Sequence, residues 1–226
     1  MTKGELKKIV SNIRKLLKQR DYVVVDSGIE LARSLDEPAV FEELLEGCTI
    51  SEDGQPVPSK FFTGSSPAQP YLDYALLGMI ASAPKSCTAA SLKNAITRLK
   101  MVLPSTQYLA ELKNLKSLDL SRSTELGEVD GLINCIKLTQ LNLSSCRSLQ
   151  NVDSLANCTK LTDLNLSYCK SLKNVDVLAN CTKLTDLNLS RLGCDSLENI
   201  DGLANCTKLT LSLIHISAPT SRYAIS

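Results

Sequence analysis

A repeated block determines what this 226-residue chain can fold into. Units with a shared pattern begin at Leu115, Leu138, Leu161, Leu184 and Leu209, so the steps between them are 23, 23, 23 and 25 residues. The second and third units carry Leu at the first, fourth and sixth positions, Cys at the ninth, and an apolar returning half. A repeat of this length predicts a solenoid, in which each unit buries its apolar face against the next.

The polar and apolar residues of each unit predict a strand followed by a tight return. In the third unit, Leu164 and Leu166 alternate with Asp163, Asn165 and Ser167, which is the pattern of a strand with one buried face. Such strands should stack in parallel about 4.8 Å apart. The returning half is too short for a long helix, so we expect one 3₁₀-like turn on the convex side.

An acidic residue stands where each of these turns should begin. We expect its carboxylate to accept backbone N–H groups there. The three residues in question are Asp153, Asp176 and Asp201.

The repeating LxxLxLxxC unit resembles the leucine-rich repeat family, in particular its short internalin-like class, whose unit is one residue shorter. The motif covers less than half of the chain. The resemblance implies an α/β solenoid with parallel strands on the concave face and short turns on the convex face. It also implies that a partner binds to the concave face.

Most of the nine cysteines fall into two columns of the repeat. A zinc site needs about four ligands that converge on one point, whereas residues in a column lie along a line. We therefore expect the thiols to pack in the core as small apolar groups, without disulfides. One column is Cys135, Cys158, Cys181 and Cys206, and the other is Cys146, Cys169 and Cys194.

The chain before the repeats has a different pattern, which predicts an α-helical cap over residues 1–95. Thr2 and Glu5 have capping-box spacing at the start of a helix that is apolar on one face and basic on the other. Two acidic helices should follow near 21–34 and 38–46, the second with Asp36 as its N-cap and Gly47 at its end.

The rest of the N-terminal region leads into the solenoid. We expect a hairpin or loop over 48–70 that turns at Asp53-Gly54, then a helix near 71–83. A degenerate first repeat should contain Ile96, Leu99 and Met101, so we assign the solenoid to residues 96–210.

The pattern breaks after Thr210, where residues 211–226 closely resemble the translated end of a transposase-type sequencing adapter. We interpret this tail as non-native and expect the natural repeat array to continue. His215, the single histidine of the chain, lies in this tail. Any Ser-His-Asp or Cys-His site would therefore take its base from the tail.

Composition and charge favour a soluble cytoplasmic protein. The net charge is +1, and no basic-then-apolar leader opens the chain. The longest apolar stretch, residues 71–83, is shorter than the roughly 18 residues that a membrane span needs. We therefore expect a cytoplasmic location and no membrane span.

The concave face supplies the candidate site. Its outward residues are polar, rich in amides and poor in aromatic groups. Asp163 and Asp186 stand side by side, where a cation or a basic partner would relieve their repulsion. The residues we select for partner binding are Gln140, Asn142, Asp163, Asn165, Tyr168, Asp186, Asn188 and Arg191.

These patterns favour a protein-interaction scaffold that binds a protein partner through the concave face. We expect no enzyme activity, no cofactor and no metal, because no phosphate-binding loop, metal cluster or nucleophile-base pair is present. Nucleic acid is not expected as a partner, because the face lacks a basic stripe.

Two alternatives stay open. The chain could be a membrane-surface or adhesin-type module that uses the basic N-terminal helix. It could also be a regulatory part of a longer protein whose activity lies in a C-terminal region. The sequence leaves the oligomeric state and the identity of the partner open.

Overall fold

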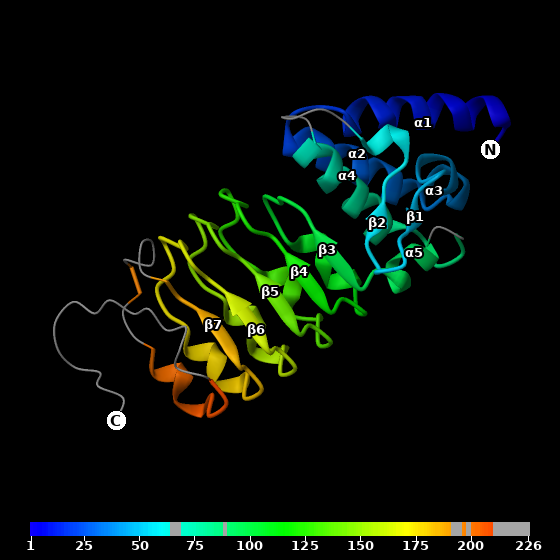
Figure 1. Ribbon diagram of the computed structural model, residues 1–226. Coiled ribbons are helices and arrows are strands. Elements are labelled where there is room, and N and C mark those ends of the chain that lie inside the picture. Colours follow the sequence, from blue (N-terminus) through cyan, green and yellow to red (C-terminus); the bar gives the residue numbers. More distant parts are fainter. Residues whose placement is uncertain (64–68, 88–89, 191–195, 198–199, 210–226) are drawn as a thin grey trace.

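The computed structural model joins an N-terminal helical region to a solenoid built on a parallel sheet (Figure 1). It describes residues 1–63, 69–87, 90–190, 196–197 and 200–209. The helical region, which we call the cap, contains α1 (Lys3–Leu17), α2 (Tyr22–Leu35), α3 (Pro38–Leu44), α4 (Gln69–Ser82) and α5 (Ser91–Ala95). Residues 211–226, with His215, lie outside the described residues, as do Arg191 and Cys194.

The solenoid carries one strand per repeat, in chain order. The sheet runs β3-β4-β5-β6-β7, and every neighbouring pair is parallel. Leu118, Leu141, Leu164 and Leu187 stand opposite one another at the centre of this register. The strands are β3 (Arg98–Lys100), β4 (Ser117–Asp119), β5 (Gln140–Asn142), β6 (Asp163–Asn165) and β7 (Asp186–Asn188).

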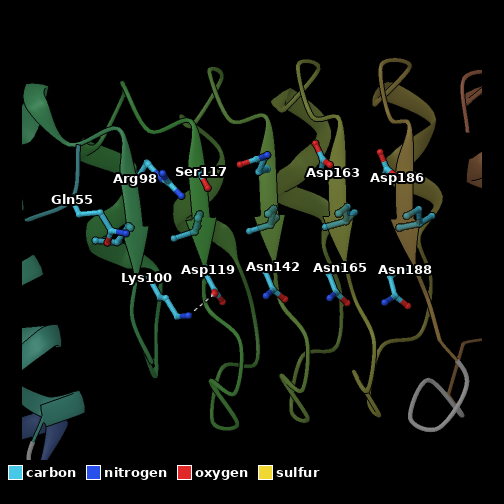
Figure 2. Close-up of a pocket in the computed structure, with 16 residues that line it drawn as sticks. Gln55, Arg98, Lys100, Ser117, Asp119, Asn142, Asp163, Asn165, Asp186 and Asn188 are labelled. Carbon is cyan, nitrogen blue, oxygen red and sulfur yellow. Dashed lines mark ion pairs between the residues drawn. The ribbon is translucent and has the colours of Figure 1, made fainter. Parts of the chain in front are cut away.

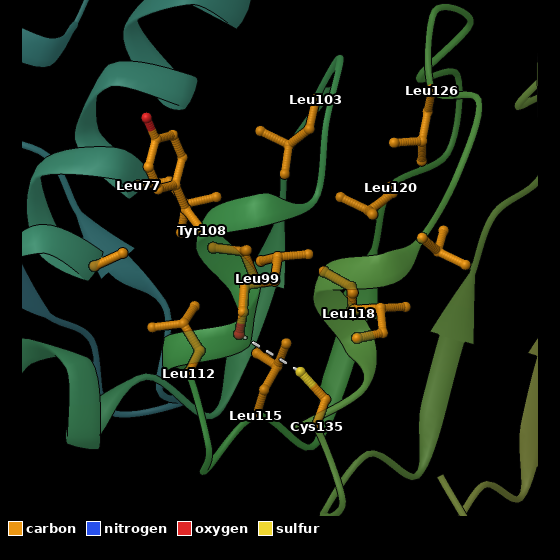
Figure 3. Packing of buried hydrophobic residues seen from close by; sticks show 14 of the residues in the cluster. Leu77, Leu99, Leu103, Tyr108, Leu112, Leu115, Leu118, Leu120, Leu126 and Cys135 are labelled. Carbon is orange, nitrogen blue, oxygen red and sulfur yellow. Dashed lines mark hydrogen bonds between the residues drawn. The ribbon is translucent and has the colours of Figure 1, made fainter. Parts of the chain in front are cut away.

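Stacking the repeats buries the apolar positions that the sequence analysis selected. The leucines of successive units form continuous ladders in one core that extends into the cap (Figure 3). The predicted first repeat is present, because Leu99 of β3 pairs with Leu118 of β4. β3 therefore joins the same ladder of leucines as the later strands, although the first repeat is shorter than the others.

The predicted 3₁₀ turns lie opposite the strands. They include η4 (Asp130–Leu132), η5 (Asp153–Asn157), η6 (Asp176–Asn180) and η7 (Asp201–Asn205). The expectation that the aspartates of these turns act as N-caps is wrong, because the N-cap lies one residue earlier in the chain. Val152 and Val175 hold the N-cap positions of η5 and η6 and provide no side-chain cap, so each aspartate sits one residue inside its turn.

The column cysteines within the described residues are buried thiols, as predicted, and each lies close to the backbone of the preceding repeat. The Sγ atom of Cys146 lies 3.3 Å from the carbonyl oxygen of Leu120, and that of Cys169 lies 3.1 Å from Leu143. A thiol can donate a weak hydrogen bond to such a buried oxygen, which a valine cannot. The cysteines therefore fill the core and also contact its backbone acceptors.

The cap begins as the sequence predicts, with a capping box between Thr2 and Glu5 at the start of α1. The apolar side of α1 buries Val10, Ile13 and Leu17 against the other helices. Its basic side stays exposed. α4 follows as a helix buried on most sides and packs on the first turn of the solenoid, η3 (Gln107–Glu111).

Three details of the cap differ from the sequence prediction. Asp36 is not the N-cap of α3; it ends α2 in the left-handed conformation with φ 45°, and Glu37 holds the N-cap position. Only two residues separate the helices, so the sharp reversal has to occur at Asp36. The second acidic helix also stops at Leu44, before the left-handed Gly47. α5 was not predicted.

The predicted hairpin is present and contacts the start of β3, the edge strand of the sheet. Its strands are β1 (Thr49–Ile50) and β2 (Pro56–Val57), joined through Gly54 at φ 85°. The Gly54 carbonyl accepts the N–H groups of Thr97 and Arg98 at 3.0 and 3.1 Å, just where β3 begins. A Cβ atom on Gly54 would lie 1.8 Å from Thr97 Oγ1, so glycine is required for this approach.

A polar cluster joins the cap to the solenoid. One carboxylate oxygen of Asp26 on α2 accepts the hydroxyl of Tyr108 on η3 at 2.7 Å and that of Tyr74 on α4 at 2.9 Å. Gln107 donates to the Tyr74 hydroxyl at 2.8 Å. Burial, together with the neighbouring carboxylate, raises the pKa of both tyrosines. We call these four residues the junction cluster.

Candidate functional site

The outward side chains of β3–β7 line one continuous groove on the concave face (Figure 2). Its volume is ≈ 420 Å³. The strands alternate, so the central leucine of each points into the core while the residues on both sides of it point into the groove. Because the strands are parallel and in register, side chains at the same position of successive repeats lie next to one another in a row across the sheet.

Two such rows define the chemistry of the face. The row at the start of the strands is Arg98, Ser117, Gln140, Asp163 and Asp186. The row at their end is Lys100, Asp119, Asn142, Asn165 and Asn188. Figure 2 shows them on opposite sides of the groove.

The second row is fixed by the backbone that follows each strand. The Oδ1 atoms of Asn142, Asn165 and Asn188 accept the backbone N–H two residues later at 3.0, 3.0 and 2.9 Å. Asp119 does the same for Ser121 at 2.9 Å. Because the oxygen of each amide is engaged, its NH₂ group is left as a donor that makes no hydrogen bond among the described residues.

The two ends of the groove differ in charge balance. At the β3 end, Lys100 lies 3.5 Å from Asp119 and Arg98 lies 3.6 Å from Asp53 of the hairpin, so both cations are paired. Burial disfavours ionisation of Asp119, but the hydrogen bonds from Ser121 and the Lys100 ammonium outweigh it and lower the carboxyl pKa. The basic end is therefore neutralised within the protein.

At the β6–β7 end the acidic groups carry no such partner. Asp163 and Asp186 are adjacent in register and make no ion pair with any described residue. The threonine before each one holds its carboxylate, with Thr162 Oγ1 2.6 Å from Asp163 Oδ2 and Thr185 Oγ1 3.0 Å from Asp186 Oδ2. Within the described residues, this end of the groove therefore presents two carboxylates that are held by hydrogen bonds and paired with no cation.

A residue in the left-handed conformation follows each of β4, β5 and β6 and leads the chain out of the face. Arg122, Ser145 and Tyr168 have φ values of 66°, 63° and 61°, in the left-handed region. Ser145 and Arg122 are held there by N–H bonds to the next repeat's carbonyl groups at 2.8 Å. This conformation places Tyr168 at the rim, with 41% of its surface exposed. Arg191, the next residue in this column, lies outside the described residues.

The strain at this position predicts a stabilising substitution. Ser145→Asn should raise the free energy of unfolding by about 0.5 kcal/mol, because Asn tolerates the left-handed region better than Ser does. Ser145→Val should lower it by about 1 kcal/mol, because a β-branched side chain is poorly accommodated there. Urea denaturation of both variants measures the difference. Equal stability of the two variants would show that the backbone is not strained at this position.

The structure places the selected residues in two groups. Gln140, Asn142, Asp163, Asn165, Asp186 and Asn188 share the groove, whereas Tyr168 stands at its rim. Arg98, Lys100 and Gln55, which were not predicted as site residues, complete the groove at the cap end. The places of Arg98 and Lys100 could have been inferred from the alignment of Ile96 and Leu99 with the first two leucines of the next repeat. Gln55 lies in the hairpin, outside the repeat pattern.

The described residues show no candidate metal cluster and no membrane-spanning helix. No group of three or more His, Cys, Asp or Glu side chains is placed to hold a metal ion there. In the same part of the chain, no helix has the length and apolar character needed to cross a membrane.

The parallel one-strand repeat, the leucine ladders and the convex 3₁₀ turns define the fold as a leucine-rich repeat solenoid with an N-terminal helical region. No protein-family model and no curated protein sequence matches the chain. Among solved structures it is similar to internalin C2 of Listeria monocytogenes, with 25% identity, a TM-score of 0.47, and 59% of this chain and 58% of the other covered.

A second similar structure is the internalin inlF of the same organism. It has 16% identity and a TM-score of 0.33, with 81% of this chain and 72% of the other covered. The chain thus spans less than two thirds of the length of internalin C2.

Proposed function

We propose that this protein is a non-catalytic interaction scaffold whose concave groove binds a protein partner with basic side chains. The observation that carries the proposal is the charge balance of the groove. The cations at the β3 end are paired internally, while Asp163 and Asp186 are not paired within the described chain. A lysine or arginine of a partner would supply the missing charge.

The second row supports recognition of a polypeptide. Its asparagine NH₂ groups are fixed in position before any partner arrives, so little side-chain entropy is lost when they donate to a partner's carbonyl groups. A partner chain that lies across the strands could meet donors on one side and carboxylates on the other. Tyr168 at the rim adds an exposed aromatic group of the kind that often anchors an interface.

Reversing the charge of the acidic pair is expected to weaken partner binding by at least about tenfold, the equivalent of about 1.4 kcal/mol. Binders would be selected from a displayed library of random peptides against the full chain. Their affinity for the wild type and for Asp163→Lys/Asp186→Lys would then be measured by fluorescence anisotropy. We expect the selected peptides to be enriched in Lys and Arg.

The convex side of the same two repeats offers a matched control. Asp153 and Asp176 are exposed on η5 and η6, so Asp153→Lys/Asp176→Lys changes the net charge equally without touching the groove. This control should bind like the wild type. Equal losses in both variants would point to long-range charge alone, and unchanged binding in both would move the site off the concave face.

We also propose a cytoplasmic location, which the thiols support. The described cysteines of the repeat columns are buried as thiols beside the backbone carbonyl groups of the preceding repeat. Free thiols are typical of a reducing compartment. Localisation of a fluorescent fusion of the full chain in its own host would test this proposal.

A further inference from the structure

A second groove lies on the cap, along the side of α1 that faces Glu43 and Phe61. Its volume is ≈ 760 Å³, and α1, Glu43 of α3 and Phe61 line it. Four cations border it, against the single carboxylate of Glu43. These cations are Lys7, Arg14, Lys15 and Lys18. None of the four makes an ion pair within the described residues.

The groove combines this charge with an apolar wall. Phe61 is partly buried, and its ring lies beneath Lys18 Nζ at 4.8 Å and the Arg14 guanidinium carbon at 5.5 Å from the centroid. These cation–π contacts hold the two cations over the ring. Arg14 also donates from Nη2 to the Glu43 backbone carbonyl at 2.9 Å, while its buried Nε has no hydrogen-bond partner.

The outer face of α1 indicates which anion fits. The large exposed apolar side chains within the described residues all lie outside α1, with Met1 just before its start, so the helix itself offers no exposed wedge to insert into a bilayer. The apolar surface of Phe61 instead lines a groove whose volume is in the range of ligand pockets. This arrangement suits carboxylates flanking an apolar side chain.

We propose that the α1 groove binds an acidic segment of a partner protein, with carboxylates on Lys7, Lys15 and Lys18 and an apolar side chain against Phe61. This site is separate from the concave groove and has the opposite charge. The protein would then hold two partners, or two parts of one partner, of complementary charge.

The test uses the full chain and a short fluorescein-labelled peptide that alternates Glu and Leu. Lys15→Gln/Lys18→Gln should weaken binding of this peptide by about tenfold, the effect of losing two surface ion pairs in one site. The matched control is Lys3→Gln/Lys8→Gln, which removes the same charge from the exposed part of the same helix outside the groove. It should change the affinity less than about twofold.

Further probes distinguish binding of an acidic, partly apolar peptide from binding of a membrane or a nucleic acid. A peptide of alternating Glu and Ser should bind more weakly than the Glu-Leu peptide, because it leaves Phe61 uncovered. Phosphatidylserine vesicles and single-stranded DNA should not compete with the Glu-Leu peptide more effectively than an unlabelled copy of it does. Equal losses in the two lysine pairs, or stronger binding to vesicles or DNA, would overturn the proposal. Neither result would bear on Asp163 and Asp186, so the concave site is tested independently.

Discussion

Raising the pH from 9 towards 11 is expected to unfold the solenoid. Burial raises the thiol pKa of Cys135 from the ordinary value of 9.0 to about 11 and those of Cys146, Cys158 and Cys181 to about 12. The folded chain therefore keeps protons that the unfolded chain releases. The resulting stabilisation is complete below pH 9 and is lost as the pH rises towards the folded-state values.

The expected effect is large because the four thiols act together. Each thiol that ionises only in the unfolded chain lowers the free energy of unfolding by about 1.4 kcal/mol per pH unit. Over two pH units the sum reaches the roughly 5–15 kcal/mol that stabilises a typical domain. Urea denaturation at a series of pH values, in the presence of a reducing agent, measures the slope.

A variant with fewer thiols provides the control for this prediction. Cys158→Ala/Cys181→Ala should be less stable at neutral pH, because the substitution leaves small cavities and removes the contacts with Leu132 and Leu155 carbonyl groups. Its loss of stability between pH 9 and 10 should nevertheless be markedly shallower than that of the wild type. Identical slopes would mean that the thiols do not control alkaline unfolding.

Replacing Asp26 is expected to damage the connection between the cap and the solenoid. Asp26→Ala should lower the free energy of unfolding by about 3 kcal/mol, because it removes charged hydrogen bonds and leaves the Tyr108 hydroxyl without its acceptor. The Tyr74 hydroxyl also loses its acceptor on α2, although it still accepts a hydrogen bond from Gln107. Denaturation of the full chain measures the loss.

Two further variants separate this effect from general damage to α2. Glu30→Ala removes an exposed acid from the same helix, where it forms a surface pair with Arg33 and no hydrogen bond to the junction cluster among the described residues, and should cost less than about 0.5 kcal/mol. Asp26→Asn retains an acceptor and should lie between the two. Hydrogen exchange should quicken in α2 and η3 of Asp26→Ala; unchanged exchange at both elements would contradict the assignment.

The repeat predicted the solenoid well because one physical requirement is imposed on every unit. Leu141, Leu164 and Leu187 must be buried together, and alternation then fixes which residues face the groove. The same reasoning predicted the strands, the convex turns and the burial of the column cysteines. It failed at the turn entrances, where Val152 and not Asp153 is the N-cap, because repeat spacing does not report backbone angles.

The cap and the charge balance were harder to predict because they depend on contacts between distant residues. Asp26 and Tyr108 are 82 positions apart, and no local pattern links them. Asp53 pairs with Arg98 only because the hairpin folds over the edge of β3. The sequence alone therefore does not reveal that Arg98 and Lys100, at the β3 end of the groove, are paired with carboxylates of the same chain.

The contact between Gly54 and the start of β3 has a consequence for how the protein is made. The chain leaves the ribosome from its N-terminus, so the cap, with its hairpin bound to the start of β3, can form before the later repeats emerge. Each new repeat then meets a finished template that extends in one direction only. Synthesis and folding can proceed in the same order, and a nascent chain exposes at most one unpaired strand edge at a time.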